Sequence, residues 1–198
     1  MFVSIEGVDG SGKSTQARLL KEYLLGLGRE VVATREPGGT ELGERVRQLV
    51  LDGPEMAPWA EAALFAASRA EHAAEVIRPA LARGADIVCD RFIDSSLAYQ
   101  GLARGLGLEE VLVLNVTVLE GLLPQRTFVL AVDAAAAGAR RKGDPDRIER
   151  EGNAFQSEVG KAYAALAERF SDRIELIDGA LPRDEIAAIV RRRVEDLL

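Results

Sequence analysis

The chain has 198 residues, of which 47% are hydrophobic and 29% charged, and its formal net charge is −7. This size and composition predict one domain with a full core, and the acidic balance argues against a protein that grips nucleic acid along its length. No apolar run approaches the roughly 18 residues of a membrane span. A single cysteine, Cys89, excludes an internal disulfide and indicates a reducing, cytoplasmic compartment. Because the first residues already read as a strand, no signal peptide is expected.

A phosphate-binding loop is predicted near the N-terminus. Phe2–Glu6 is a short apolar run typical of a buried parallel strand, and G-V-D-G-S-G-K-S follows it. This octet fits G-x-x-x-x-G-K-[ST], in which backbone N–H groups cradle phosphate, the lysine reaches the outer phosphates and the last hydroxyl holds Mg²⁺. A helical pattern follows up to Gly28, so a chance glycine-rich turn is the weaker alternative. The residues expected to bind nucleotide phosphate are Gly7, Val8, Asp9, Gly10, Ser11, Gly12, Lys13, Ser14 and Thr15.

The second strand is predicted at Glu30–Thr34, directly before R-E-P-G-G-T at residues 35–40. Pro-Gly-Gly makes a tight loop, which the strand directs to the same sheet edge as the phosphate loop. A helix is predicted over Glu41–Leu51, and Gly53 and Pro54 end it.

A long alanine-rich helix is predicted from Pro58 to Arg83. Phe65, Arg69 and His72 recur at i, i+4 and i+7 and therefore share one face. From spacing alone, the favoured interpretation is that this face packs in the core and that Arg69 is solvated. The alternative is an aromatic plate beside a planar donor, which suits a flat heterocycle.

A third strand is predicted over Ala85–Cys89, with D-R-F at residues 90–92 on its carboxyl end. A carboxylate at this edge of an α/β sheet is well placed for Mg²⁺ or a substrate hydroxyl. A helix over Ile93–Arg104 follows. It carries Ser96 and Gln100 on one face, with Tyr99 beside them.

The remaining elements continue the alternation of strands and helices. They are helices over about 108–119, 134–139, 149–170 and 182–198, and strands at Thr127–Asp133 and Arg173–Ile177. The order predicts a doubly wound α/β fold with five parallel strands flanked by helices.

A basic cluster with glycine and proline occupies residues 140–148. It can be an ordinary charged turn or a hinged lid that brings cations over a phosphate. Because this cluster is positively charged in a chain of negative net charge, the lid is favoured.

Several families share a phosphate loop, and the rest of the chain separates them. GTP-binding switches carry N-K-x-D, which neither Asn115 nor Asn153 begins. The arginines near the strand ends and the basic cluster favour a small-molecule kinase that uses ATP and Mg²⁺. A nucleotide-binding sensor without turnover is the alternative from another class.

Five stretches in order resemble the thymidylate kinase family, bacterial type. They are E-G-V-D-G-S-G-K-S-T-Q (6–16), R-E-P-G-G-T (35–40), L-F-A-A-S-R-A-E-H (64–72), D-R-F-I-D-S-S-L-A-Y-Q-G (90–101) and D-R-I-E (146–149). The resemblance implies one P-loop kinase domain over residues 1–198 with a lid at about 140–148. It also implies transfer of the γ-phosphate of ATP to dTMP, with no nucleic-acid or membrane partner, in a homodimer.

The resemblance also assigns roles around the acceptor phosphate. Asp9 would lie on the sugar 3′-hydroxyl side, and Arg91 would hold the dTMP phosphate. Asp90 would join Ser14 on the metal side. Arg35 and Glu36 would support the same corner.

The family resemblance turns the aromatic face of the long helix into a base pocket. Phe65 would stack on thymine, and Arg69 would donate to a thymine carbonyl. Ser96 and Gln100 would complete base reading, Tyr99 would sit against the deoxyribose, and Arg47 would border the nucleotide. This pocket favours a 4-oxo pyrimidine, which makes dUMP a secondary substrate. Another nucleoside monophosphate kinase is the alternative within this class.

The catalytic cation is expected from the lid, because Gly10 stands where other family members carry a basic residue in the phosphate loop. Arg140 is expected near ATP. The residues expected to act in catalysis are Asp9, Lys13, Arg91, Arg141 and Arg147, and which of Arg140, Arg141 and Arg147 reaches the γ-phosphate stays open.

Overall fold

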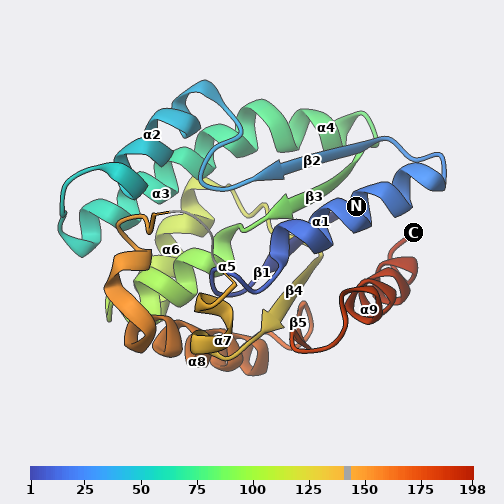
Figure 1. Ribbon diagram of the computed structural model, residues 1–198. Helices are drawn as coiled ribbons and strands as arrows, with labels where there is room; N and C mark the ends of the chain where they lie inside the picture. Colours follow the sequence, from blue (N-terminus) through green and yellow to red (C-terminus); the bar gives the residue numbers. More distant parts are fainter. Residues whose placement is uncertain (141–143) are drawn as a thin grey trace.

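The computed structural model describes residues 1–140 and 144–198, in which five parallel strands form one sheet of order β2-β3-β1-β4-β5 (Figure 1). The strands are β1 (Phe2–Glu6), β2 (Val31–Arg35), β3 (Asp86–Asp90), β4 (Arg126–Ala131) and β5 (Ile174–Asp178). The predicted doubly wound parallel sheet is confirmed. β1 has the predicted ends, and the ends of the other four strands differ from the prediction by one or two residues.

Helices cover both faces of the sheet (Figure 1). The α-helices are α1 (Lys13–Gly26), α2 (Glu41–Asp52), α3 (Pro58–His72), α4 (Arg78–Ala82), α5 (Ile93–Ser96), α6 (Leu108–Val118), α7 (Ala134–Gly138), α8 (Gly152–Arg169) and α9 (Arg183–Glu195). Two π-helical segments, η1 (Ala73–Ile77) and η2 (Leu97–Ala103), and one 3₁₀ turn, η3 (Glu149–Glu151), complete the helical elements of the described ranges. None of these helices is both long and apolar enough to cross a bilayer.

The core consists of two apolar clusters, one on each face of the sheet. Successive strand residues point to opposite faces, so Val88 packs in the cluster with α1 and α9 while Ile87 and Cys89 pack in the other. The three central strands, β1, β3 and β4, are buried on both faces, which explains their near-continuous apolar sequence, whereas the edge strands β2 and β5 are partly exposed. The sheet is therefore a rigid platform for the loops at its carboxyl edge.

Two predicted helices contain π-helical turns. The helix predicted over Pro58–Arg83 is α3, η1 and α4 in succession, and Pro79 near the junction has no N–H for a regular ladder. The helix predicted over Ile93–Arg104 changes to π geometry at Leu97. Such segments are frequent at functional sites, and η2 carries both Tyr99 and Gln100.

The register brings the predicted loops to one edge of the sheet. Asp90 pairs with Ile5 of β1 and with Arg35 of β2, so the phosphate loop, the R-E-P-G-G loop and the D-R-F segment start side by side. The α2 helix begins where the Thr40 side chain accepts a hydrogen bond of 2.9 Å from the Gly43 N–H. This cap fixes the direction in which α2 leaves the edge.

Candidate active site

The loop after β1 has a glycine-dependent backbone. Gly7, Gly10 and Gly12 have φ angles of 138°, 85° and 99°, which residues with a Cβ rarely adopt. A Cβ at Gly10 would also lie 2.1 Å from the carbonyl oxygen of Ala137 on α7. The loop and α7 are thus in direct backbone contact, and no larger residue fits at position 10 without moving α7.

Lys13 and Ser14 begin α1 and lie beside acidic groups. The Lys13 ammonium donates to the Val8 carbonyl at 2.9 Å and lies 3.6 Å from the Asp9 carboxylate. Burial, and next the nearby Arg91 charge, lower the pKa of Lys13 to about 8. The Ser14 hydroxyl donates to the Asp90 carboxylate, so two oxygen groups that suit Mg²⁺ lie together.

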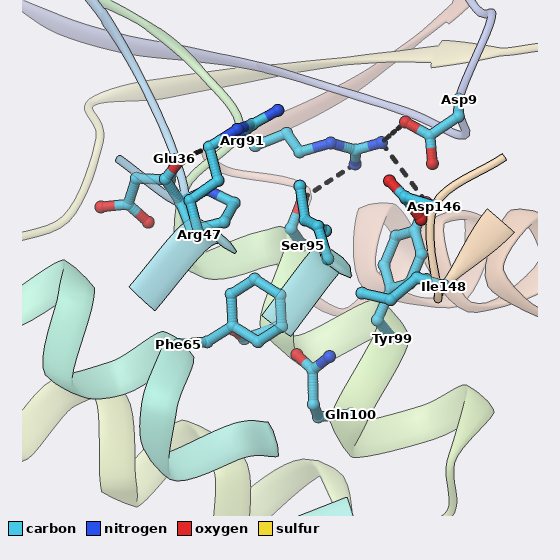
Figure 2. A pocket seen from close by; sticks show the side chains of 13 residues that line it. Asp9, Glu36, Arg47, Phe65, Arg91, Ser95, Tyr99, Gln100, Asp146 and Ile148 are labelled. Atoms are coloured by element: carbon cyan, nitrogen blue, oxygen red, sulfur yellow. Dashed lines mark hydrogen bonds and ion pairs between the residues drawn. The ribbon is translucent and has the colours of Figure 1, made fainter. Parts of the chain in front are cut away.

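Arg91 lies at the centre of the site (Figure 2). Its guanidinium donates to the Asp9 carboxylate at 2.5 Å and to the Ser95 hydroxyl at 3.1 Å, with Tyr99 also in reach at 3.4 Å. The backbone of Arg91 has φ 69°, in the left-handed region that non-glycine residues avoid. This strained backbone and the hydrogen bonds aim the side chain into the space between the loop and η2.

Glu6 is connected to Arg91 through Ser95, which hydrogen-bonds to both, and this role was not predicted from the sequence. It accepts hydrogen bonds from the Phe92 N–H at 2.7 Å, the Ser95 hydroxyl at 2.6 Å and the Tyr163 hydroxyl at 2.8 Å. Complete burial, followed by repulsion from Asp94, raises the pKa of Glu6 to about 7. The sequence signal that could have indicated this role is a glutamate at the end of an otherwise apolar strand.

A pocket opens beside Arg91, between α2, α3 and η2 (Figure 2). Its lining residues are Asp9, Glu36, Pro37, Arg47, Leu51, Phe65, Arg91, Ser95, Ser96, Tyr99, Gln100, Asp146 and Ile148. The Phe65 ring and the Gln100 amide face each other across one end (Figure 2). The chemistry of the pocket therefore changes from apolar and amide groups at one end to a guanidinium at the other.

Eight of the ten predicted substrate residues line this pocket, and the two others do not. Arg35 lines a neighbouring cavity and pairs with Glu44 at 2.9 Å. Arg69 is 1% exposed and donates to Glu36 at 2.7 Å, to Ser96 at 2.9 Å and to Asn115. Arg69 is therefore neither solvated nor exposed as a donor at the pocket wall. It lies behind Glu36 and Ser96, which do line the pocket.

A second cavity adjoins the first along the phosphate loop. It is lined by Asp9, Gly10, Gly12, Lys13, Ser14, Thr15, Arg35, Glu36, Arg47, Asp90, Arg91, Arg140 and Glu149. Five of these residues are cations, in a chain whose formal charge is −7. The two cavities share Asp9, Glu36, Arg47 and Arg91, so Arg91 is in reach of both.

The predicted lid residues have different positions. Arg140 lines the second cavity, whereas Arg141 lies outside the described residues. Arg147 is 2% exposed, donates to Glu61 at 2.6 Å and to the Val50 carbonyl at 2.9 Å, and lines neither cavity. The structure thus corrects the expected position of Arg147, because the buried carboxylate of Glu61 on α3 holds this guanidinium.

The site thus combines a phosphate loop with an adjoining pocket that has arginines at one end. Comparisons with known proteins agree with this arrangement. A family model described as thymidylate kinase matches residues 5–189. The chain belongs to the thymidylate kinase family. It is 49% identical over 199 residues to the thymidylate kinase of Leifsonia xyli subsp. xyli, covering 98% of this chain and 94% of that one. The thymidylate kinase of Bifidobacterium longum strain DJO10A is 46% identical over 202 residues, covering 100% and 98%.

A solved thymidylate kinase shares the fold. The crystal structure from Ehrlichia chaffeensis superposes with a TM-score of 0.79 at 34% identity, covering 96% of this chain and 98% of that one. The predicted family and kinase class are therefore confirmed. Thymidylate kinases use ATP as phosphate donor, which agrees with the loop at residues 7–14.

Proposed function

We propose that this chain transfers the γ-phosphate of ATP to dTMP, giving dTDP and ADP for dTTP synthesis. The observation that carries the proposal is the position of Arg91, whose guanidinium lines both the phosphate-loop cavity and the Phe65–Gln100 pocket. A donor and an acceptor phosphate that meet at one arginine are the arrangement phosphoryl transfer requires. The proposal also includes a single domain over residues 1–198, a lid at about 140–148 and a cytoplasmic location.

On the donor side, the loop at residues 7–15 would hold the ATP phosphates through backbone N–H groups and Lys13. The Ser14 hydroxyl and the Asp90 carboxylate are hard oxygen ligands that already lie together, so they fit Mg²⁺. When bound, Mg²⁺ neutralises charge on the transferred phosphate. Arg140, which lines the same cavity, would add a cation near ATP.

On the acceptor side, Arg91 would hold the dTMP phosphate, with Arg47 beside it. Phe65 would stack on the thymine ring, and its place in the pocket wall, where it is 9% exposed, supports that role. Tyr99 and Asp9 would contact the deoxyribose. Each charge-assisted contact to phosphate is worth about 1.5–3 kcal/mol, so Arg91 dominates the orientation of the acceptor.

The base would be read by Ser96 and Gln100, with Arg69 acting behind them. Arg69 holds Ser96 and Glu36 in place, since it donates to both from a fully buried position. Glu36 and Arg35 complete the corner between the two cavities.

The catalytic cation is proposed to come from the lid, from Arg140 or Arg141. The contact between Gly10 and α7 supports this assignment, because the loop has no space for a long basic residue at position 10. A cation that meets the transferred group mainly in the transition state raises the rate rather than the ground-state affinity. Closure of the lid would also keep water from ATP.

The reaction is tested by incubating the purified chain with ATP, Mg²⁺ and dTMP and following dTDP by chromatography. We expect one dTDP for each ADP formed, and loss of both products when EDTA removes the metal. ADP without dTDP would show hydrolysis and would contradict the proposal.

We predict that kcat/KM for ATP falls as the pH rises through about 8. Lys13 has its pKa lowered to about 8, so it carries a proton below this pH and loses it above. The pH profile of kcat/KM reports the pKa values of the free enzyme. Bound ATP stabilises the charged lysine, so the decrease in kcat should occur at a higher pH than the decrease in kcat/KM. Steady-state rates between pH 6.5 and 9.5 at varied ATP measure both profiles. A flat kcat/KM to pH 9.5 would contradict the lowered pKa of Lys13.

We propose that the chain forms a homodimer, as its family resemblance implies. Within α6 only Val111 and Asn115 are fully buried, and Val113 is 64% exposed. Trp59 on α3 and Leu49 on α2 are also exposed, at 48% and 43%. We predict that sedimentation at micromolar concentration gives a species of twice the 21.3 kDa chain mass. A species of 21.3 kDa alone would refute the dimer.

A further inference from the structure

Glu61 on α3 lies next to the base pocket without lining it, and three donors share its carboxylate. The side chain is 1% exposed. Its Oε1 accepts from Gln100 Nε2 at 2.8 Å and from Arg104 Nε at 2.7 Å, and its Oε2 accepts from Arg147 at 2.6 Å. Gln100 does line the pocket, where its amide points toward the Phe65 ring (Figure 2).

An ionised carboxylate can only accept hydrogen bonds. Burial raises the pKa of Glu61, but hydrogen bonds from Arg104, Gln100 and Arg147 more than offset this and leave the pKa below its ordinary value. The NH₂ group of the Gln100 amide must therefore face Glu61. The amide oxygen is then the group that Gln100 offers to the pocket.

We propose that Glu61 is a positioning residue that fixes the Gln100 amide with its oxygen toward the base, and thereby sets the preference for thymine over cytosine. The inference rests on the proposed function. The ring nitrogen N3 of thymine carries a proton and donates, whereas N3 of cytosine accepts. An amide oxygen in the pocket pairs with thymine and leaves cytosine with two acceptors facing each other.

Glu61→Gln tests the orientation of the Gln100 amide, because it changes the hydrogen bonding of residue 61 and keeps its side-chain shape. Arg147 is fully buried, and within residues 1–140 and 144–198 its one carboxylate partner is Glu61, whereas Arg104 also pairs with Glu151 at 3.0 Å. The new amide is expected to keep its oxygen toward Arg147 and to turn its NH₂ toward Gln100. The Gln100 amide then rotates and presents NH₂ to the base, which suits cytosine.

The test measures kcat/KM for dTMP and for dCMP. In Glu61→Gln we expect the dTMP-to-dCMP ratio to fall by about 10- to 100-fold, with a larger change in KM than in kcat. Arg104→Met is the matched control, because it removes another Glu61 partner that does not line the pocket. Its thermal stability should fall while the ratio stays within about threefold. An unchanged ratio in Glu61→Gln, or an equal fall in both variants, would overturn the proposal.

A double-mutant cycle tests whether Glu61 acts through Gln100. In a Gln100→Met background, Glu61→Gln should no longer change the substrate ratio, because the amide is gone. The same fall in both backgrounds would overturn the proposal. A wild-type protein that makes no dTDP contradicts the proposed function instead, so the two failures are distinguishable.

A measurement on the wild-type protein covers the case in which Glu61→Gln does not fold. The side-chain NH₂ resonances of Gln100 are assigned in a ¹⁵N spectrum by their absence in Gln100→Met. We expect slow solvent exchange for these protons, before and after dTMP is added, because they are bound to Glu61. Exchange at the rate of an exposed glutamine amide would overturn the proposal.

Discussion

Arg91→Met is expected to lower kcat/KM for dTMP by about 100- to 10,000-fold. Loss of two charge-assisted contacts to the acceptor phosphate costs about 3–6 kcal/mol, and 1.36 kcal/mol corresponds to tenfold in rate. Methionine keeps the length and apolar stem of the side chain, so the pocket shape is preserved. Steady-state kinetics at varied dTMP measure the effect.

Two controls separate this role from a structural one. Arg91→Lys keeps the charge at a left-handed position but loses the paired donors, so it should retain more activity than Arg91→Met. ATP affinity should change only a few-fold in both variants, because Lys13 and the loop remain. A decrease of less than tenfold in kcat/KM for dTMP in Arg91→Met would show that the acceptor phosphate binds elsewhere.

Lys13→Ala is expected to lower kcat at saturating ATP by about 1000-fold or more, because the lysine neutralises charge that develops on the transferred phosphate. The fold should persist, since the ammonium contacts the Val8 carbonyl and Asp9 within the loop. The rate of dTDP formation at saturating substrates measures the change.

Lys161→Ala on α8 is the matched control, because Lys161 is an exposed lysine paired with Glu158. It should keep wild-type kinetics. A normal rate of transfer in Lys13→Ala would refute the role of the phosphate loop.

The parts of the fold that depend on local pattern could be predicted from the sequence. The apolar run at Phe2–Glu6 and the glycine-rich octet define a strand, a loop and a helix start because each has a narrow set of allowed residues. The alternation of strands and helices then determines a parallel sheet. The gathering of Asp90 and Arg91 near the loop follows from the shared carboxyl edge of that sheet.

Side-chain partners far apart in the sequence could not be predicted in this way. Arg147 was expected over a phosphate, but Glu61, 86 positions away, holds it in a buried pair. Arg69 was expected at the pocket wall, but Glu36 and Asn115 bind it behind that wall. The sequence indicates that a buried charged residue needs a partner, but the partner can be identified only from the folded structure.

The most direct test of the proposed kinase activity is the rate of nucleoside diphosphate formation with ATP, Mg²⁺ and each of dTMP, dUMP, dCMP, dGMP and AMP as acceptor. We predict fast turnover with dTMP, slower turnover with dUMP and little with the others, because Phe65 and Gln100 would select a 4-oxo pyrimidine. Comparable turnover with dCMP or a purine would contradict the base pocket. No turnover with any acceptor, despite tight ATP binding, would contradict the assignment as a kinase.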